Sequence, residues 1–281
     1  MRFTKMQGLG NDYVYVNCFR ETVTEPEKLA KKLSDRHFGV GGDGLILILP
    51  SHCADFRMEI YNADGSRARM CGNGLRCAGK LAYESGLCRG TGLTVETLAG
   101  LRRITLLKEN GVVTEVCADM GVPRYNAHAI PILSEKDLVL DEPIQVRGKD
   151  YRITGISMGN PHAVVYVEDV WNYPVKEEGP GFEFHPRFPE RINTEFCEIK
   201  DRTHIHMRVW ERGAGETLAC GTGACAAVAA SVLNHLTEEE VTVTLLGGNL
   251  NIRWDRKLNH IFMTGPAVRV FDGETEEQEN Q

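Results

Sequence analysis

The chain contains one sequence unit twice, and this repetition constrains the fold more than any other feature. The pattern Cys-Gly-x-Gly stands before a helix-like run at Cys71 and again at Cys220, 149 positions later. Other motifs repeat with it: Gly10-Asn11 recurs as Gly159-Asn160 and Tyr61-Asn62 as Trp210-Glu211 at the same shift, and 93–100 recurs as 241–248 at a shift of 148. Several matches in register indicate an ancient duplication, with one domain per copy.

Each copy shows short β-branched runs around one apolar helix. The strand-like runs are 12–19, 45–50, 56–62, 93–100, 102–111 and 112–121, and then 151–158, 163–170, 195–200, 204–211, 241–248, 250–254 and 261–271. The run after Cys220 is small and apolar on nearly every side, so its helix is expected to be buried. The sequence therefore predicts an α/β (α+β) fold of two pseudo-symmetric domains, each with strands wrapped around a buried helix.

A further helix is expected over 26–38, with Thr24 and Glu27 as its capping box. Pro and Gly interrupt the strand pattern at 121–133, which is where we expect the two domains to join. The first domain is accordingly expected over 1–120 and the second over 121–265.

The composition excludes some classes of protein. The chain has 281 residues, 42% of them hydrophobic and 25% charged, and a net charge of −7. No basic stripe is visible, which argues against nucleic-acid binding. No apolar run is long enough to cross a bilayer, and 1–13 lacks the apolar core of a signal peptide. We therefore expect a cytoplasmic protein that binds neither nucleic acid nor membranes.

Nine cysteines are many for that compartment. There is no C-x-x-C pair, and the local spacings around Cys71 and Cys220 suit zinc poorly, so neither a metal site nor a redox pair is expected. Cys77 and Cys225 fall within predicted helices and are expected in the core. Five others are expected to be small buried hydrophobes, namely Cys18, Cys53, Cys88, Cys117 and Cys197.

A cysteine at a glycine-rich helix start is suited to holding a carboxylate beside a reactive sulfur. The helix N-terminus presents unpaired N–H groups and the positive end of the dipole, and glycine lets a ligand approach the backbone. The same field is expected to lower the pKa of the thiol from about 8.5 toward neutrality. Cys71 and Cys220 are therefore the candidate reactive groups of the two copies.

Two such copies related by a pseudo-twofold axis would place the sulfurs on opposite sides of one cleft. A carbon acid between them can lose its proton to one sulfur and regain a proton from the other, which inverts the stereocentre. One cysteine must be thiolate and the other thiol, while the helix N-termini stabilise the charge that develops on the carboxylate. No dinucleotide fingerprint or pyridoxal-type lysine motif stands out, so no cofactor is expected.

Six motifs resemble those of the diaminopimelate epimerase family: GLGNDYV, NADGS, CGNGLRC, SMGNPHAVVYV, ERINTEF and ERGAGETLACGTGACA. That family interconverts LL- and meso-diaminopimelate without a cofactor, for lysine and peptidoglycan synthesis. The resemblance implies two domains, each a curved, mostly antiparallel sheet around a central helix. It also implies that the end of the chain, 266–281, rejoins the first domain, and that the protein is a homodimer.

The resemblance further assigns roles to individual residues. Cys71 and Cys220 match the two catalytic bases, Glu211 matches the group near the reacting amine, and His162 lies in the wall of the site. Some family members carry glutamine where this chain has Gly44, so a side-chain contact with substrate is not expected there. The cradle of the reacting carboxylate matches Gly72, Asn73, Gly221 and Thr222, and other substrate-binding positions match Asn11, Asn62, Asn160, Asn193 and Arg212.

Other interpretations stay open. The two cysteines could be buried structural thiols or a disulfide, Asn11 and Asn160 could be turn residues, and Glu211 with Arg212 could be an exposed ion pair of little consequence. Rival functions are a proline or hydroxyproline racemase on the same scaffold, and an amino-acid-binding or thiol redox-sensing protein. Arg212 favours a substrate with a second carboxylate, which a proline racemase does not require.

Overall fold

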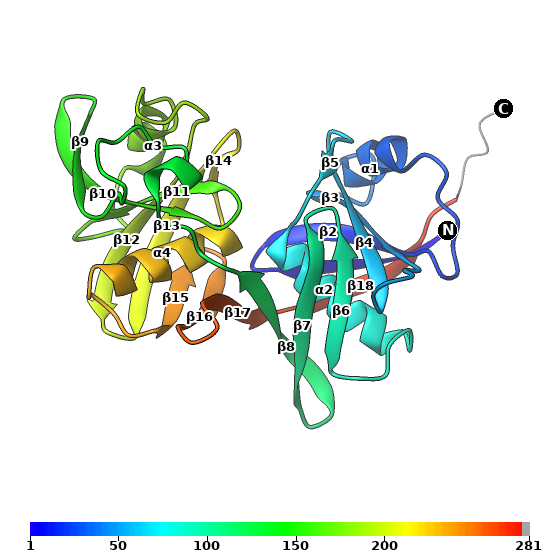
Figure 1. Cartoon of the computed structure of the whole chain (residues 1–281). Coiled ribbons are helices and arrows are strands. Elements are labelled where there is room, and N and C mark those ends of the chain that lie inside the picture. The colour runs from blue at the N-terminus through cyan, green and yellow to red at the C-terminus, as the bar shows by residue number, and fades with distance from the viewer. Residues whose placement is uncertain (277–281) are drawn as a thin grey trace. The chain divides into compact units, whose positions relative to one another are not determined.

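The computed structural model describes residues 1–276 and divides into two compact units (Figure 1). One unit comprises Met1–Ala118 with the C-terminal segment from Gly265, and the other comprises Asp119–Thr264. The final residues, 277–281, which the sequence assigned to the first domain, lie outside the described residues. Each unit is a sheet-rich structure that encloses a long helix, which confirms the predicted α/β fold class.

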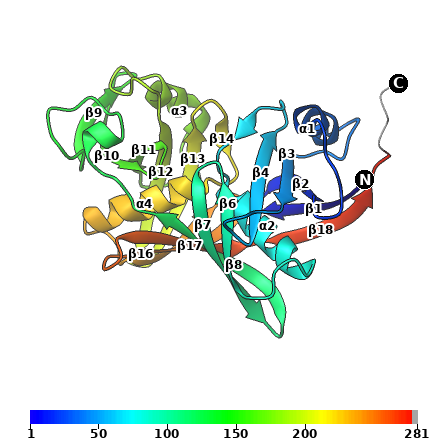
Figure 2. The ribbon, with the colours of Figure 1, turned by 45° about the vertical axis from the view of Figure 1, so that its right-hand side comes forward.

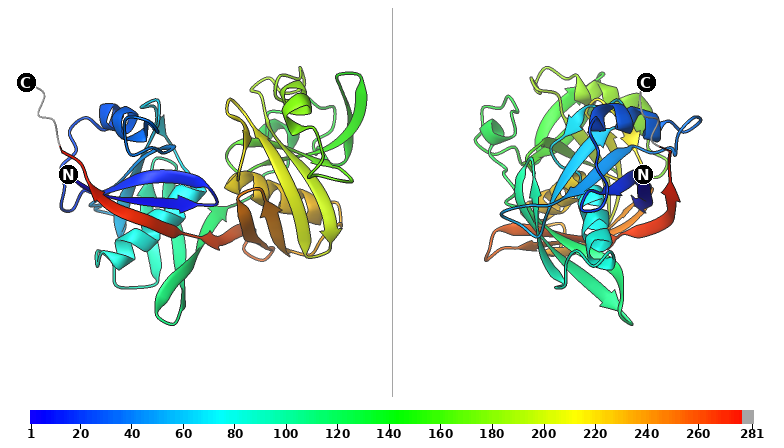
Figure 3. Two further views of the ribbon diagram at one scale, coloured as in Figure 1. Left: turned by 180° about the vertical axis from the view of Figure 1, so that it is seen from behind. Right: turned by 90° about the vertical axis from the view of Figure 1, so that its right-hand side faces the viewer.

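The first unit pairs its strands in both senses. β1 and β2 form a hairpin, β2 runs parallel to β3, β3 is antiparallel to β4, and β4 runs parallel to β6. β18 returns from the end of the chain to lie antiparallel beside β1 (Figure 3). The elements are β1 (Arg2–Gly8), β2 (Asn11–Asn17), α1 (Pro26–Ser34), β3 (Gly44–Leu49), β4 (Phe56–Asn62), β5 (Arg67–Ala68), α2 (Gly72–Glu84), β6 (Gly92–Thr97), β7 (Gly100–Glu109), β8 (Val112–Gly121) and β18 (Val268–Glu274).

The second unit repeats this order of pairing. β10 and β11 form the hairpin, β11 runs parallel to β12, β12 is antiparallel to β13, and β13 runs parallel to β15. β9 takes the place beside β10 that β18 takes beside β1. The elements are η1 (Ala127–Ala129), β9 (Glu142–Val146), β10 (Lys149–Ser157), β11 (Pro161–Tyr166), α3 (Val175–Glu183), β12 (Asn193–Asp201), β13 (His204–Glu211), β14 (Gly215–Thr217), α4 (Gly221–Leu233), β15 (Glu240–Leu245), β16 (Gly248–Asp255) and β17 (His260–Pro266).

The central helices α2 and α4 are equivalent in length and position, with 13 residues each (Figure 2). α2 packs against β1, β2, β3, β4 and β7, and α4 against β10, β11, β12, β15 and β16. Small residues permit close packing: a Cβ on Gly79 would lie 2.1 Å from Cδ1 of Ile104. Burial of these helices fixes the position of their first turns, where the candidate cysteines lie.

Several local predictions were wrong. α1 begins at Pro26 after Glu25 and has no side-chain cap, so Thr24 and Glu27 do not form a capping box, and the helix ends at Ser34. α3 was not predicted because Gly and Pro interrupt its sequence. Among the cysteines expected to be buried, Cys53 is exposed, Cys18 and Cys117 are half-buried, and Cys88 and Cys197 are buried as predicted.

All nine cysteines are free, and Cys77 and Cys225 are buried in the core as predicted. In the part of the chain that the structure describes, no helix has both the length and the apolar character needed to span a bilayer.

Candidate functional site

The first half-site is the start of helix α2, where Cys71 is the N-cap residue. Its backbone is extended, with φ −142° and ψ 116°, and its Sγ accepts a hydrogen bond from the backbone N–H of Gly74 at 3.4 Å. The thiol in turn donates to Oδ1 of Asn11 at 3.2 Å. Asn11 lies at the end of the β1–β2 turn, so the duplicated Gly-Asn motif and the duplicated Cys-Gly motif meet at this sulfur.

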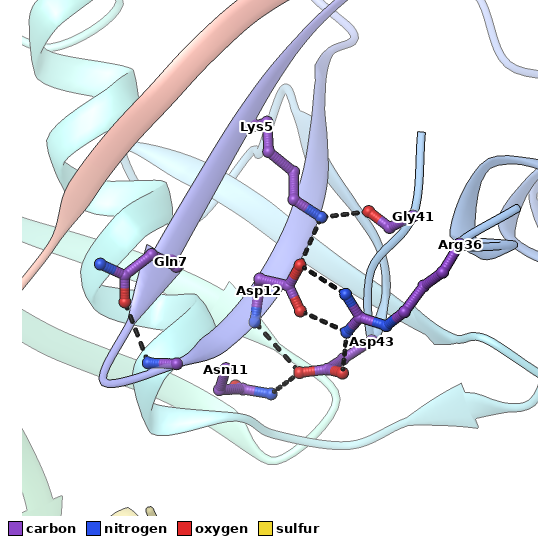
Figure 4. A network of polar contacts seen from close by, with 8 residues as sticks. Lys5, Gln7, Asn11, Asp12, Arg36, Gly41 and Asp43 are labelled. Atoms are coloured by element: carbon purple, nitrogen blue, oxygen red, sulfur yellow. Dashed lines mark hydrogen bonds and ion pairs between the residues drawn. The ribbon is translucent and has the colours of Figure 1, made fainter. Parts of the chain in front are cut away.

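A charged network fixes Asn11 in that orientation (Figure 4). Nδ2 of Asn11 donates to Oδ2 of Asp43 at 2.7 Å, and Asp43 also accepts from Arg36 at 3.0 Å. Arg36 bridges to Asp12, which pairs with the buried Lys5 at 2.6 Å. Because Asp43 accepts from the amide nitrogen, the amide oxygen of Asn11 is left for the thiol of Cys71.

The second half-site is the start of helix α4, where Cys220 is the N-cap residue. Its backbone is likewise extended, with φ −119° and ψ 110°, and its Sγ accepts from the backbone N–H of Gly223 at 3.4 Å. Oγ1 of Thr222 lies 3.5 Å from the same sulfur. The capping geometry of Cys71 is therefore repeated 149 residues later, as the sequence repeat predicts.

The second Gly-Asn motif leads to a buried contact between a histidine and a glutamate. Nδ2 of Asn160 donates to Oγ1 of Thr222 at 3.2 Å, and Oδ1 of Asn160 lies 3.1 Å from Nε2 of His162. Nδ1 of His162 lies 2.7 Å from Oε1 of Glu195, and both side chains are fully buried. Adjacent pairing of β11 and β12 places His162 and Glu195 beside the first turn of α4.

Glu211, at the end of β13, also contacts Cys220. It accepts a hydrogen bond from the hydroxyl of Thr217, and burial raises the pKa of its carboxyl group, although the bonds to Thr217 and Cys220 lower that pKa in part. Within residues 1–276, no ion pair joins Glu211 to Arg212, so the interpretation of these two as a surface ion pair is wrong.

The expectation that the two thiols are acidic is also wrong. Burial raises the pKa of Cys71 above its ordinary value, and the hydrogen bonds from Gly74 and Tyr13 offset only part of that effect. The pKa of Cys220 is raised further, first by burial and then by the carboxylates of Glu211 and Glu195. Desolvation of a thiolate therefore outweighs the field of the helix N-terminus in both half-sites.

Other predicted site residues are already engaged within the protein. Asn193 donates to the carbonyl of Pro161 at 2.7 Å and accepts from the backbone N–H of Arg212 at 3.0 Å. Asn73 accepts from the buried Arg76 at 2.8 Å, and Asn62 donates to Ser66 at 3.0 Å within a turn. The side chain of Asn193 thus joins neighbouring segments of the second half-site, that of Asn73 is bonded within the first turn of α2, and that of Asn62 is bonded within a turn.

Arg212 and Gly44 differ in what they can offer to a ligand. The exposed guanidinium of Arg212 donates to the carbonyl of Glu190 at 2.8 Å, and within residues 1–276 no carboxylate pairs with it. Gly44 has no room for a side chain, since a Cβ there would lie 2.2 Å from the carbonyl oxygen of Tyr61. Gly221 is similarly confined, with a Cβ 2.9 Å from Sδ of Met263.

The sequence analysis missed Asp43, Arg76 and Glu195. Asp43 carried a signal, because it follows two glycines in GGDG, where a polar side chain is free to cap a neighbouring turn. Glu195 stands in a strand-like run that is mostly apolar. A carboxylate in such a run is buried with the strand, and burial of that kind indicates a polar partner, which is His162 here. Within residues 1–276, no group of three or more His, Cys, Asp or Glu side chains could hold a metal ion.

Comparison with known proteins gives a consistent result along the whole chain. The family model described as diaminopimelate epimerase matches residues 3–126 and 154–270. Diaminopimelate epimerase of Acetivibrio thermocellus is 55% identical over 276 residues, covering 98% of this chain and 99% of that protein. The enzyme of that name from Methanococcus maripaludis strain C5 is 53% identical over 274 residues, covering 98% of this chain and 99% of its own.

Solved structures share the fold at much lower identity. A PhzF-family phenazine biosynthesis protein of Bacillus anthracis superposes with a TM-score of 0.71 at 19% identity, covering 98% of this chain and 99% of that one. A probable proline racemase of Agrobacterium radiobacter K84 superposes with a TM-score of 0.70 at 15% identity, covering 99% and 93%. At this identity the likeness concerns the fold alone.

Proposed function

The chain belongs to the diaminopimelate epimerase family, and we propose that it interconverts LL- and meso-diaminopimelate with Cys71 and Cys220 as two bases. The observation that carries the proposal is the repeated N-cap: each central helix begins directly after a cysteine whose sulfur accepts a first-turn N–H. A structural thiol would not need this arrangement twice. The first-turn N–H groups beside each sulfur, at Gly72 and Asn73 and at Gly221 and Thr222, are suited to a carboxylate.

In the proposed reaction, one sulfur acts as thiolate and removes the α-proton. The electron pair of the C–H bond passes to a carbanion that is stabilised by the adjacent carboxylate and by the helix N–H groups. The thiol of the other cysteine then gives its proton to the opposite face of that carbon. The two sulfurs exchange protonation states in each turnover, and the mechanism requires that both reach one carbon from opposite faces. No cofactor takes part in this scheme.

We assign the distal carboxylate of the substrate to Arg212, with Asn11, Asn62, Asn160 and Asn193 around the substrate. The exposed guanidinium retains donors for a planar carboxylate, which a point charge could not match as well. Glu211 is assigned to the reacting amine, and burial of its carboxyl group favours a cationic partner. Proline has no second carboxylate, so these residues favour diaminopimelate over a proline substrate.

The test is exchange of the substrate α-proton in deuterated water, followed by the conversion of LL- to meso-diaminopimelate. We expect solvent deuterium at the inverted centre, with activity that survives dialysis against a chelator and treatment with hydroxylamine. In parallel reactions with proline and 4-hydroxyproline, the α-proton should not exchange with solvent deuterium. A protein that binds diaminopimelate without exchange would be a binding protein, and the proposal would fail.

We also propose the finer properties that the family resemblance implies: a cytoplasmic homodimer in lysine and peptidoglycan precursor synthesis. Sedimentation equilibrium tests the oligomeric state, with a mass of twice 31.3 kDa expected. Complementation of a bacterial strain that lacks its own epimerase tests the pathway, since growth without added meso-diaminopimelate requires the complete reaction.

A further inference from the structure

Tyr13 lies on the face of strand β2 that packs against the first turn of helix α2. Side chains alternate between the two faces of a strand, so Asn11, Tyr13 and Tyr15 share one face. Asn11 accepts from the thiol of Cys71 at 3.2 Å. The hydroxyl of Tyr15 donates to the carbonyl of Gly74 at 3.4 Å. Tyr13 stands between these two contacts and is only 6% exposed, so its ring is buried at the same turn.

The ring of Tyr13 has room because Gly44 carries no side chain. The parallel pairing of β2 with β3 sets Tyr13 opposite Gly44, and a Cβ on Gly44 would lie 2.8 Å from Cε1 of the tyrosine ring. The pairing of β11 with β12 sets His162 opposite Asn193, and these two residues stand 149 positions after Tyr13 and Gly44. The first unit therefore holds one large phenol beside a glycine where the second unit holds an imidazole beside an amide.

The hydroxyl of Tyr13 is hydrogen-bonded to the sulfur of Cys71. Burial raises the pKa of Cys71, and the bond from Tyr13 lowers that pKa in part, which is the sign expected when a phenol donates to a thiolate. Burial also raises the pKa of Tyr13 above its ordinary value of 10.0. The phenol therefore keeps its proton, and remains a donor, over the pH range in which a thiol ionises.

Cys71 accordingly has a partner in each of its protonation states. As a thiol it donates to Oδ1 of Asn11, because Nδ2 of the same amide is bonded to Asp43 (Figure 4). As a thiolate it accepts from the hydroxyl of Tyr13, in addition to the backbone N–H of Gly74. The acceptor and the donor come from the same face of β2, two residues apart.

We propose that Tyr13 is a positioning residue for Cys71, whose phenol hydroxyl donates to the sulfur and stabilises its thiolate form. The role of that thiolate as a base rests on the proposed function, whereas the contact between the phenol and the sulfur does not. The other titratable or charged groups that face Cys71 or Tyr13 are Arg76, Tyr15, Cys77 and Asp43.

The substitution Tyr13→Phe removes this donor and keeps the ring beside Gly44. Without the hydrogen bond the thiolate of Cys71 is less stable, so the pH midpoint of its ionisation should rise, by about one unit for a hydrogen bond to a charged group. A tyrosine that only fills space would leave the midpoint unchanged. A hydroxyl that accepted the proton of the thiol would stabilise the thiol instead, and its removal would lower the midpoint.

The experiment measures the rate of iodoacetamide alkylation of Cys71 against pH in the substrate-free protein. Trypsin releases this cysteine in the peptide 70–76, which contains no other thiol, and the exposed Cys53 is the internal reference for the reagent. The matched control is Tyr15→Phe, which removes a buried phenol of the same strand that is bonded to the carbonyl of Gly74 instead. In this control the midpoint of Cys71 should not move.

An unchanged or lowered midpoint of Cys71 in Tyr13→Phe would overturn the proposal, and so would an equal rise in Tyr15→Phe. If Tyr13→Phe does not fold, Tyr13→Leu decides, because it also lacks the hydroxyl, and an unchanged midpoint there is equally fatal. A protein that shows the expected rise but fails to exchange the α-proton of diaminopimelate refutes the proposed function and leaves this contact intact. Normal exchange with an unchanged midpoint in Tyr13→Phe refutes only the role of Tyr13.

Discussion

Replacing Asn193 with alanine should destabilise the second unit, because its side chain joins two strands. The amide donates to the carbonyl of Pro161 at 2.7 Å and accepts from the N–H of Arg212 at 3.0 Å, and the residue is only 4% exposed. Leaving a buried carbonyl without its partner costs about 1–3 kcal/mol, and the loss of the second bond adds about 1 kcal/mol. We therefore expect the free energy of unfolding to fall by roughly 2–4 kcal/mol.

The tryptophans allow this loss of stability to be measured in the second unit alone. All three, Trp171, Trp210 and Trp254, lie within Asp119–Thr264, so their fluorescence during urea unfolding reports on the second unit. The expected loss corresponds to a decrease of about 1–2 M in the urea midpoint. Asn172→Ala, which removes an exposed amide bonded to Asp169, is the control and should shift the midpoint little. An unchanged midpoint in Asn193→Ala, with a raised KM, would show that this amide serves the substrate and not the strands.

Three further predictions concern the site and its support. Cys71→Ser and Cys220→Ser should each lose epimerisation yet eliminate a β-leaving group from opposite stereoisomers; elimination from the same isomer in both would contradict the two-base assignment. Arg212→Lys should raise KM for diaminopimelate at an unchanged melting temperature, because the ammonium loses the planar fork, and unaltered kinetics would remove it from the site. The ion pairs of Asp12 with Arg36 and Lys5 lower its pKa below 3.8 despite burial, so its stabilising contribution is lost as pH falls through that lowered pKa. Asp12→Asn should accordingly show a smaller stability difference between neutral and acidic pH in urea titrations followed by circular dichroism.

The positions of the two central helices could be predicted because their signals are local and repeated. Cys71 and Cys220 each precede glycines and an apolar run, and those helices do begin at Gly72 and Gly221. Helix α3 could not be predicted, since Gly179 and Pro180 contradict local propensity and the helix is held by tertiary packing, with Gly179 against the ring of Trp210.

The electrostatics of the half-sites could not be predicted either. The thiol pKa values depend on burial and on Glu195 and Glu211, which reach Cys220 from two other strands. Contacts between residues on different strands cannot be inferred from local sequence, whereas a helix N-terminus at a cysteine can. Local sequence therefore indicated the field of the helix N-terminus correctly, but it gave the wrong sign for the net shift of the thiol pKa.

The duplicated half-sites are alike in backbone and unlike in charge, and the proposed reaction needs both properties. In the proposed reaction either sulfur exchanges a proton with the substrate carbon, and the equal capping geometry of the two cysteines is consistent with that shared role. Unequal surroundings, with the buried Arg76 near Cys71 and the carboxylates of Glu211 and Glu195 near Cys220, give the two sulfurs different proton affinities before substrate binds. Two identical thiols would have no preferred distribution of one proton between them.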